Sequence, residues 1–160
     1  MLFMQTIIEV KGLSAKEITD FLLNCNDDNY RQWWRDVHLE FHQLKSSPGH
    51  IGDLVYMDEH IGKFRMTAKA RVTKLIPGKL IVWQVTRIIR MPIVLTLKLE
   101  DTVDGVIISH TIEAGFRRMG KLFDFILRFY MPRGFEDEMD KHVKTEFPKL
   151  RDLLRACAST

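Results

Sequence analysis

The feature that most constrains this chain is a stretch in which apolar and polar residues alternate one by one. From residue 64 to residue 72, one set of alternate positions holds Phe64, Met66, Ala68, Ala70 and Val72, and the other holds Arg65, Thr67, Lys69 and Arg71. Successive side chains of a strand point to opposite faces of a sheet. This segment therefore predicts a strand with one buried and one solvated face, which is typical of an antiparallel sheet covered on one side.

The same alternation recurs further along the chain. Pro77-Gly78 and Asp104-Gly105 are turn signals, and each is followed by another alternating segment. A further segment alternates Leu95, Leu97 and Leu99 with Thr96, Lys98 and Glu100. The last segment, residues 106–114, places His110 among its apolar positions. Shorter segments rich in β-branched and aromatic residues predict strands at residues 2–10, 37–43 and 53–60. We therefore expect seven strands in total.

Helices are expected before the second strand and after the last one. Ser14, followed three residues later by Glu17, forms a capping box that begins a first helix, and Asp27 and Asp28 cap a second. Near the end of the chain, apolar residues recur at helical spacing, at Phe135, Met139, Val143, Phe147, Leu150 and Leu154. Pro148 predicts a kink or break inside this long helix. The expected order is one strand, two helices, six strands and a long helix, which defines an α+β fold.

Composition sets further bounds. The chain has 160 residues, of which 46% are hydrophobic and 28% charged, so we expect one folded domain over residues 1–160. A net charge of +3 gives no reason to expect a nucleic-acid partner. Two cysteines and an N-terminus without a basic segment favour a cytoplasmic protein. Charged residues at Arg87, Arg90 and Lys98 interrupt the most apolar stretch, so no membrane-spanning helix is expected.

A ligand cavity is predicted from the way these elements must pack. A bent antiparallel sheet has one concave apolar face, and the C-terminal helix is the long amphipathic element available to cover it. Ala68, Ala70 and Ala114 would project into the space beneath that helix and leave it unfilled. We therefore expect a cavity that holds a hydrophobic small molecule.

At this point the sequence resembles a known superfamily. Gly52 opens a strand, Pro77-Gly78-Lys79-Leu80 forms a turn that leads to Trp83, and a helix from Glu146-Phe147 to Leu153-Leu154 ends the chain. Together with the element order, these features resemble the SRPBCC superfamily, which includes START-related, pollen-allergen-like, polyketide cyclase and lipid-transfer proteins. The resemblance implies a helix-grip fold, with a curved seven-stranded sheet wrapped around the C-terminal helix, and a hydrophobic ligand. It brings no catalytic signature.

Two functional hypotheses follow. The first is non-catalytic binding or transport of a lipid-like, polyketide-like or aromatic molecule. The residues expected to line the cavity are Trp33, Tyr56, Phe64, Met66, Trp83, Leu97, His110, Phe125, Met139 and Val143. The alternative, which the resemblance also allows, is a cyclase, aromatase or dehydratase in which His110 and Tyr56 act as acid and base. His110 could equally be a core histidine with a protein partner.

For two neighbouring strands, the sequence does not decide which side chains point towards the cavity. Either Tyr56 and Asp58 or the residues between them could point inward, although an outward Asp58 avoids the cost of a buried carboxylate. His38, Glu40 and His42 share one face of a regular strand and could in principle hold a divalent metal. No further ligand lies nearby in the sequence, so we expect neither a metal nor another cofactor.

An apolar helix expected at residues 121–131 suggests possible partners. Within residues 117–133, five basic residues stand against one acidic residue, Asp124. One interpretation is a cavity lid that touches an anionic membrane transiently, and a second is a homodimer contact. The third is a helix buried between the sheet and the C-terminal helix.

Overall fold

The computed structural model describes residues 2–86, 90–115 and 132–158. Its strands are β1 (Leu2–Lys11), β2 (His38–Lys45), β3 (Leu54–Ile61), β4 (Phe64–Ile76), β5 (Leu80–Thr86), β6 (Arg90–Asp101) and β7 (Gly105–Ala114). Its helices are α1 (Ala15–Leu23), α2 (Asp27–Trp33) and α4 (Phe135–Ala158). The order of the elements agrees with the α+β order that the sequence predicts. The helix expected at residues 121–131 lies outside the described residues.

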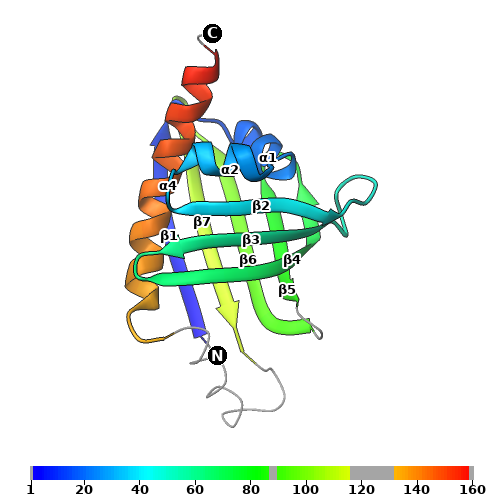
Figure 1. Ribbon diagram of the computed structural model, residues 1–160. Coiled ribbons are helices and arrows are strands. Elements are labelled where there is room, and N and C mark those ends of the chain that lie inside the picture. The colour runs from blue at the N-terminus through cyan, green and yellow to red at the C-terminus, as the bar shows by residue number, and fades with distance from the viewer. Residues whose placement is uncertain (1, 87–89, 116–131, 159–160) are drawn as a thin grey trace.

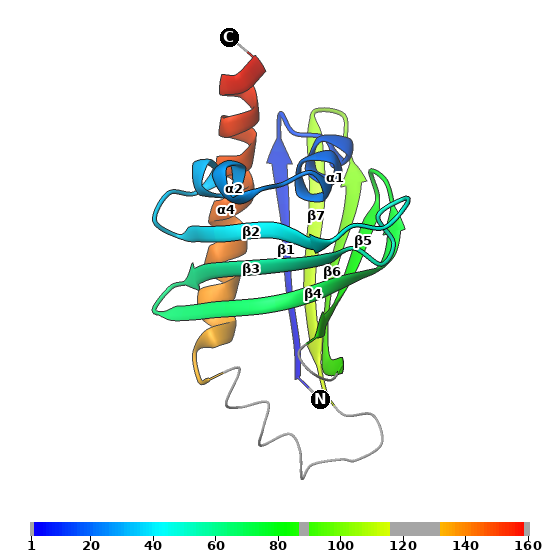
Figure 2. The same cartoon turned by 45° about the vertical axis from the view of Figure 1, so that its right-hand side comes forward.

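The strands form a seven-stranded antiparallel sheet in the order β1-β7-β6-β5-β4-β3-β2. The first strand therefore pairs with the last, from Leu2 opposite Ala114 to Lys11 opposite Gly105. Figures 1 and 2 show that β2, β3 and β4 run across the direction of β1, β7 and β6, so the sheet is strongly bent. Helix α4 packs against β1, β3 and α2, on the concave side of this sheet.

Alternation sets the buried face of the sheet as expected. In β7, the side chains of Val106, Ile108, His110, Ile112 and Ala114 are all buried, whereas Ile107 and Glu113 are exposed. β7 thus contributes mainly branched aliphatic side chains to the concave face, and removal of their apolar surface from water favours folding. His110 is one of the polar residues on that face.

The helix termini follow local sequence, with two differences from expectation. The capping box of Ser14 and Glu17 is present. The second helix, however, is capped by Asn26, whose side chain accepts a hydrogen bond from the backbone N–H of Asn29. Helix α4 runs without a break through Pro148, since buried side chains on both sides of the proline hold it against the sheet. Within the described ranges, no helix has the length and apolar character required to span a membrane.

A β-bulge at the start of β2 makes the side chains of that strand point to other faces than predicted. His38 is paired with Glu59 and Glu40 with Asp58, so two steps along β2 match one step along β3. The extra residue turns His38 to the inner face, where it is fully buried together with Phe41. His38 therefore does not share a face with Glu40 and His42, and the three residues do not form a common group.

Candidate functional site

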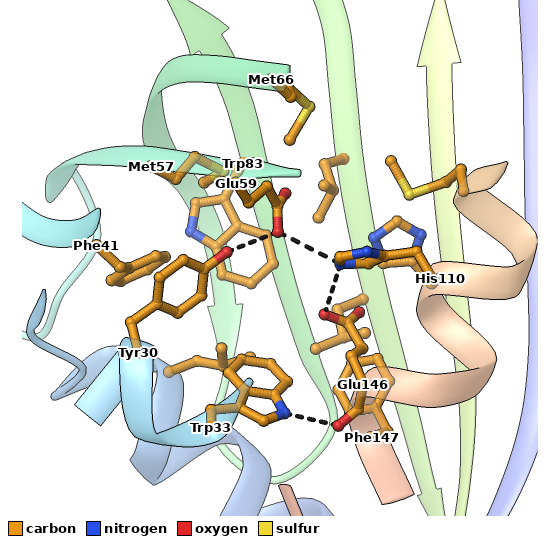
Figure 3. A pocket seen from close by; sticks show the side chains of 15 residues that line it. Tyr30, Trp33, Phe41, Met57, Glu59, Met66, Trp83, His110, Glu146 and Phe147 are labelled. Atoms are coloured by element: carbon orange, nitrogen blue, oxygen red, sulfur yellow. Dashed lines mark hydrogen bonds and ion pairs between the residues drawn. The ribbon is translucent and has the colours of Figure 1, made fainter. Parts of the chain in front are cut away.

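A pocket lies between the concave face of the sheet and helices α2 and α4 (Figure 3). Its lining comprises Leu22, Tyr30, Trp33, Phe41, Met57, Glu59, Met66, Trp83, Leu95, Leu97, His110, Met139, His142, Glu146 and Phe147. The cavity volume is about 80 Å³. For comparison, a dry cavity of about 150 Å³ is known to hold one benzene molecule. The pocket in this conformation thus has room for a guest of only a few heavy atoms.

The wall of the pocket is adaptable. Met57, Met66 and Met139 contribute three unbranched side chains from β3, β4 and α4. Methionine has several rotatable bonds and a polarisable sulfur, so it fills irregular space and repacks at low cost. Rotation of these side chains would enlarge the cavity without movement of the backbone.

One end of the pocket is ionic. Glu59 projects from β3 and Glu146 from α4, and their carboxylates approach each other across the cavity (Figure 3). His142 Nε2 lies 3.4 Å from a carboxylate oxygen of each. His38 Nε2 lies 3.7 Å from Glu59 and 3.6 Å from Glu146. We refer to His38, Glu59, His142 and Glu146 as the buried cluster.

The local sequence explains how these four side chains meet. His142 and Glu146 are four residues apart on α4, so they lie on the same face of the helix, one turn apart. His38 and Glu59 are directly opposite each other on neighbouring strands. Because α4 packs against β3, the helical pair meets the strand pair. All four residues are buried.

Aromatic residues hold the buried cluster in place. The Tyr30 hydroxyl donates a hydrogen bond of 2.7 Å to Glu59 Oε2. The Tyr30 ring also stacks on the His38 ring, with 4.0 Å between centroids and an angle of 5° between the planes. Trp34 stacks on His142, with centroids 4.9 Å apart. Trp33 Nε1 donates to the backbone carbonyl of Glu146 at 2.6 Å, which joins α2 to α4.

The charges of the cluster shift the pKa values of its members. Burial by itself lowers the pKa of His142, but the adjacent carboxylates of Glu146 and Glu59 outweigh burial and raise it to about 10. Burial raises the pKa of Glu146, but His142 and His38 outweigh that effect and hold it at about 2. Burial and the charge of Glu59 raise the pKa of Tyr30 well above its ordinary range. Without another cation, His142 is therefore an imidazolium at neutral pH.

Hydrogen bonding within the cluster is incomplete. Among the described residues, neither nitrogen of His38 has a hydrogen-bond partner, and neither does His142 Nε2. The contacts of 3.4–3.7 Å to the carboxylates are ion-pair distances without hydrogen-bond geometry. Buried polar atoms are nearly always paired in folded proteins, so three unpaired nitrogens in one place require an explanation.

His110 reaches the same pocket from β7 (Figure 3). It lies on β7, opposite Leu97 of β6, and is buried. Burial lowers its pKa below the ordinary value of 6.5, against the opposing effect of the Glu146 and Glu59 carboxylates. His110 is therefore a neutral imidazole at pH 7 and could donate a hydrogen bond to a ligand or accept one from it.

Six of the residues predicted to line the cavity do line this pocket, namely Trp33, Met66, Trp83, Leu97, His110 and Met139. Phe64 and Val143 are not part of its lining; Phe64 packs against Phe135 instead, with ring centroids 5.8 Å apart. Phe125 lies outside the described residues.

Tyr56 is also absent from the lining of the pocket. Val55 is buried and Met57 and Glu59 line the pocket, so the intervening Tyr56 belongs to the outer face, where its ring lies 5.3 Å from that of His42. Asp58 shares that face and forms a two-pronged hydrogen-bonded ion pair with Arg65. The proposed acid/base pair of His110 and Tyr56 is thus not brought together.

The cavity does not arise from the three alanines expected to form it. None of Ala68, Ala70 and Ala114 lines the pocket, which is bounded by large side chains. Tyr30, Glu59, His142 and Glu146 line it as well and were not predicted. The useful signal was the spacing of His142 and Glu146, because both fall on the apolar stripe of α4, between Met139 and Leu150.

A bent antiparallel sheet that holds a long C-terminal helix over a pocket defines a helix-grip protein. Solved structures of this fold superpose on nearly the whole chain. A Staphylococcus aureus protein of unknown function matches with a TM-score of 0.60 and 11% identity, over 99% of this chain and 98% of its own. A Nitrosomonas europaea protein matches with a TM-score of 0.57 and 11% identity, over 98% of this chain and 97% of its own. Ginseng major latex-like protein 151 from Panax ginseng matches with a TM-score of 0.55 and 12% identity, over 89% of this chain and 98% of its own.

The helix-grip fold that the resemblance implies is therefore confirmed. Identities of 11–12% are too low to carry a function from these proteins to this one. No protein-family model matches the sequence, and a comparison with curated proteins finds no match.

Proposed function

We propose that this protein binds a small hydrophobic molecule in the pocket between the sheet and α4, with a polar group of the ligand directed to the buried cluster. The observation that carries the proposal is the composition of the wall. Most of the wall is made of aromatic and aliphatic groups such as Trp83, Leu97 and Phe147, and one end carries Glu59 and Glu146. Pockets of this kind bind by apolar burial and orient the ligand through a few polar groups.

The size of the pocket favours a compact ligand over a long acyl chain. Among lipid-like, polyketide-like and aromatic molecules, a single aromatic ring demands the least rearrangement of Met57, Met66 and Met139. Complete burial of one ring removes roughly 150 Å² of apolar surface from water, worth about 4 kcal/mol before the cost of ordering the ligand. An isolated ring therefore binds weakly, and larger ligands must gain affinity through polar contacts or through an enlarged cavity.

The carboxylates set the preferred polar group. Glu59 and Glu146 accept hydrogen bonds, so a ligand hydroxyl or amine can bind there, whereas a ligand carboxylate would be repelled. His110, as a neutral imidazole, can contribute one further hydrogen bond from β7. The resemblance to helix-grip proteins implies a hydrophobic ligand in the grip, which supports this location.

The enzyme alternative loses its basis in the pair of His110 and Tyr56, because Tyr56 faces outward. We therefore propose binding without catalysis. Burial also holds Tyr30 as a phenol, so it offers no phenolate nucleophile.

The proposal is tested by titration with phenol, indole and 2-naphthol, followed by the fluorescence of the tryptophans, since Trp33 and Trp83 line the pocket. Saturable quenching is expected. The variant Met66→Trp places an indole in the cavity and should weaken binding by about tenfold or more, because the guest then loses most of its buried surface.

The control is Ile76→Trp, at an exposed position of the same strand, where 41% of the side chain is accessible. It should bind like the wild type. Equal weakening in both variants, or no saturable binding by any of the three probes, would contradict the proposal.

A further inference from the structure

We propose that the buried cluster of His38, Glu59, His142 and Glu146 is a binding site for one divalent transition-metal cation of the Zn²⁺ type. This inference does not depend on the hydrophobic-ligand proposal. It starts from the position of four atoms, His38 Nε2, His142 Nε2 and one carboxylate oxygen each from Glu59 and Glu146. Ligand atoms from these four residues all lie within 4.8 Å of one another.

The distances fit a four-coordinate cation. Zn²⁺ binds histidine nitrogen and carboxylate oxygen at about 2.0–2.2 Å, and the edge of a tetrahedron is about 1.63 times the centre-to-vertex distance, so neighbouring ligand atoms lie about 3.3–3.6 Å apart. The two contacts of His142 are 3.4 Å, and those of His38 are 3.6 and 3.7 Å. All four distances between a nitrogen and an oxygen thus fall within about 0.2 Å of the length that a tetrahedral site requires.

A second observation points to a missing partner at the centre of the cluster. His38 is fully buried and His142 is more than nine-tenths buried, yet the Nε2 atoms of both lack a hydrogen-bond partner within the described part of the chain. Ion-paired histidines in a folded protein would normally rotate to donate good hydrogen bonds to their carboxylates. A cation between the four atoms would satisfy both nitrogens without any such rotation.

The donor set indicates the kind of cation. Two imidazole nitrogens suit zinc and its first-row neighbours, whereas magnesium and calcium prefer an all-oxygen shell. Two carboxylates balance the charge of a divalent ion, so the occupied site would carry no net charge in the protein interior. With four protein ligands, the site has the closed arrangement of a structural metal.

The surroundings resemble an outer ligand shell. Tyr30 donates to Glu59 Oε2 and stacks on the His38 ring, and Trp34 stacks on the His142 ring. Such contacts fix the orientation of metal ligands before the metal arrives. His38 Nδ1 is a departure from the usual pattern, because it has no hydrogen-bond partner among the described residues.

The competing account is a cluster of imidazolium and carboxylate groups held together by charge alone. The imidazole nitrogens would then carry the protons that a metal ion would displace. The two accounts differ in a direct way: a metal site takes up one cation per chain and releases protons, whereas the ion-pair cluster binds none.

The test uses the full chain after treatment with a chelator. Zn²⁺ is added in a calorimetric titration, and Co²⁺ in a parallel optical titration, since four-coordinate Co²⁺ has visible absorption bands much stronger than those of the hydrated ion. The variants are His142→Gln and Glu146→Gln, which keep the size of the side chain. Their matched control is His42→Gln, which removes a histidine beside a carboxylate, Asp27, on the solvent side of β2.

One equivalent of Zn²⁺ should bind to the wild type and to His42→Gln, with the Co²⁺ bands of a four-coordinate site. Each cluster variant should lose more than about 100-fold in affinity, because loss of an outer-shell partner alone typically costs about 10–100-fold. At a free Zn²⁺ concentration of about 100 times Kd, the wild-type Tm should rise by about 5–10 °C.

The proposal is overturned if the wild type binds less than one equivalent with micromolar affinity or better, or if the cluster variants bind as tightly as His42→Gln. If a cluster variant fails to fold, the wild-type Co²⁺ spectrum decides: a spectrum of hydrated, six-coordinate Co²⁺ contradicts the site. Because no hydrophobic probe is present, failure here leaves the ligand proposal untouched, and failure of the ligand proposal leaves this one untouched.

Discussion

Replacement of Tyr30 by phenylalanine removes one oxygen atom and leaves the ring that stacks on His38. That oxygen donates a 2.7 Å hydrogen bond to the carboxylate of Glu59, and both groups are buried. Hydrogen bonds to charged groups contribute about 1.5–3 kcal/mol to stability, and loss of the donor leaves Glu59 with a less solvated charge. Tyr30→Phe should therefore lower the free energy of unfolding by about 1.5–3 kcal/mol.

The measurement is urea unfolding in the presence of a chelator, so that metal binding does not contribute. The midpoint should fall with little change in slope, because the surface exposed on unfolding is nearly the same. For a chain of this length, Tm should fall by about 3–12 °C.

Tyr56→Phe is the matched control for this prediction. Tyr56 lies on the outer face of β3, and loss of its hydroxyl should change stability by less than about 0.5 kcal/mol. If Tyr30→Phe costs no more than Tyr56→Phe, the hydroxyl does not support the carboxylate, and the description of the buried cluster as a polar network would be wrong.

Two further predictions concern groups outside the pocket. Arg155, together with Ser14, holds the pKa of Glu17 at about 2, below its ordinary 4.5, so the stability that Glu17 contributes is complete above pH 4.5 and is lost as the pH falls towards 2. The difference in unfolding free energy between wild type and Glu17→Gln should therefore shrink between pH 7 and pH 3; a constant difference would contradict the ion pair. Burial raises the pKa of the Cys25 thiol to about 12, whereas Cys157 is exposed. Iodoacetamide at pH 8 should alkylate Cys157 first, as read by peptide mass spectrometry, and equal rates would show that the Cys25 site opens readily.

Most of the fold could be predicted from the sequence because local signals and tertiary packing agree. The alternation from Phe64 to Val72 and the turn at Asp104-Gly105 set strands and connections that the structure contains. Pro148 is one exception, since its local effect on the helix is outweighed by packing of Phe147 and Leu150 against the sheet. The N-cap of α2 is Asn26, one residue before the predicted Asp27, because either side chain can accept the required hydrogen bond.

The pocket could be predicted only in part. Side chains that follow regular alternation or helical spacing, such as Trp83, Leu97 and Met139, are among those that line it. His38 could not be placed, because a bulge of one residue reverses the facing of a strand and leaves no clear mark in the sequence. The meeting of Glu59 with Glu146 depends on how α4 crosses β3, which is a long-range property of the fold.

We propose that the space beneath α4 admits a hydrophobic guest by movement of its methionine side chains. This is measured by titrating methyl-¹³C-methionine protein with phenol and recording NMR spectra. The signals of Met57, Met66 and Met139 should shift together and saturate at millimolar phenol, because the cost of ordering the ligand offsets most of the gain from burying one ring. The signal of Met4, a core residue of β1 outside the lining of this pocket, should move far less. Unchanged signals from the three pocket methionines at saturating phenol would show that no guest enters the pocket.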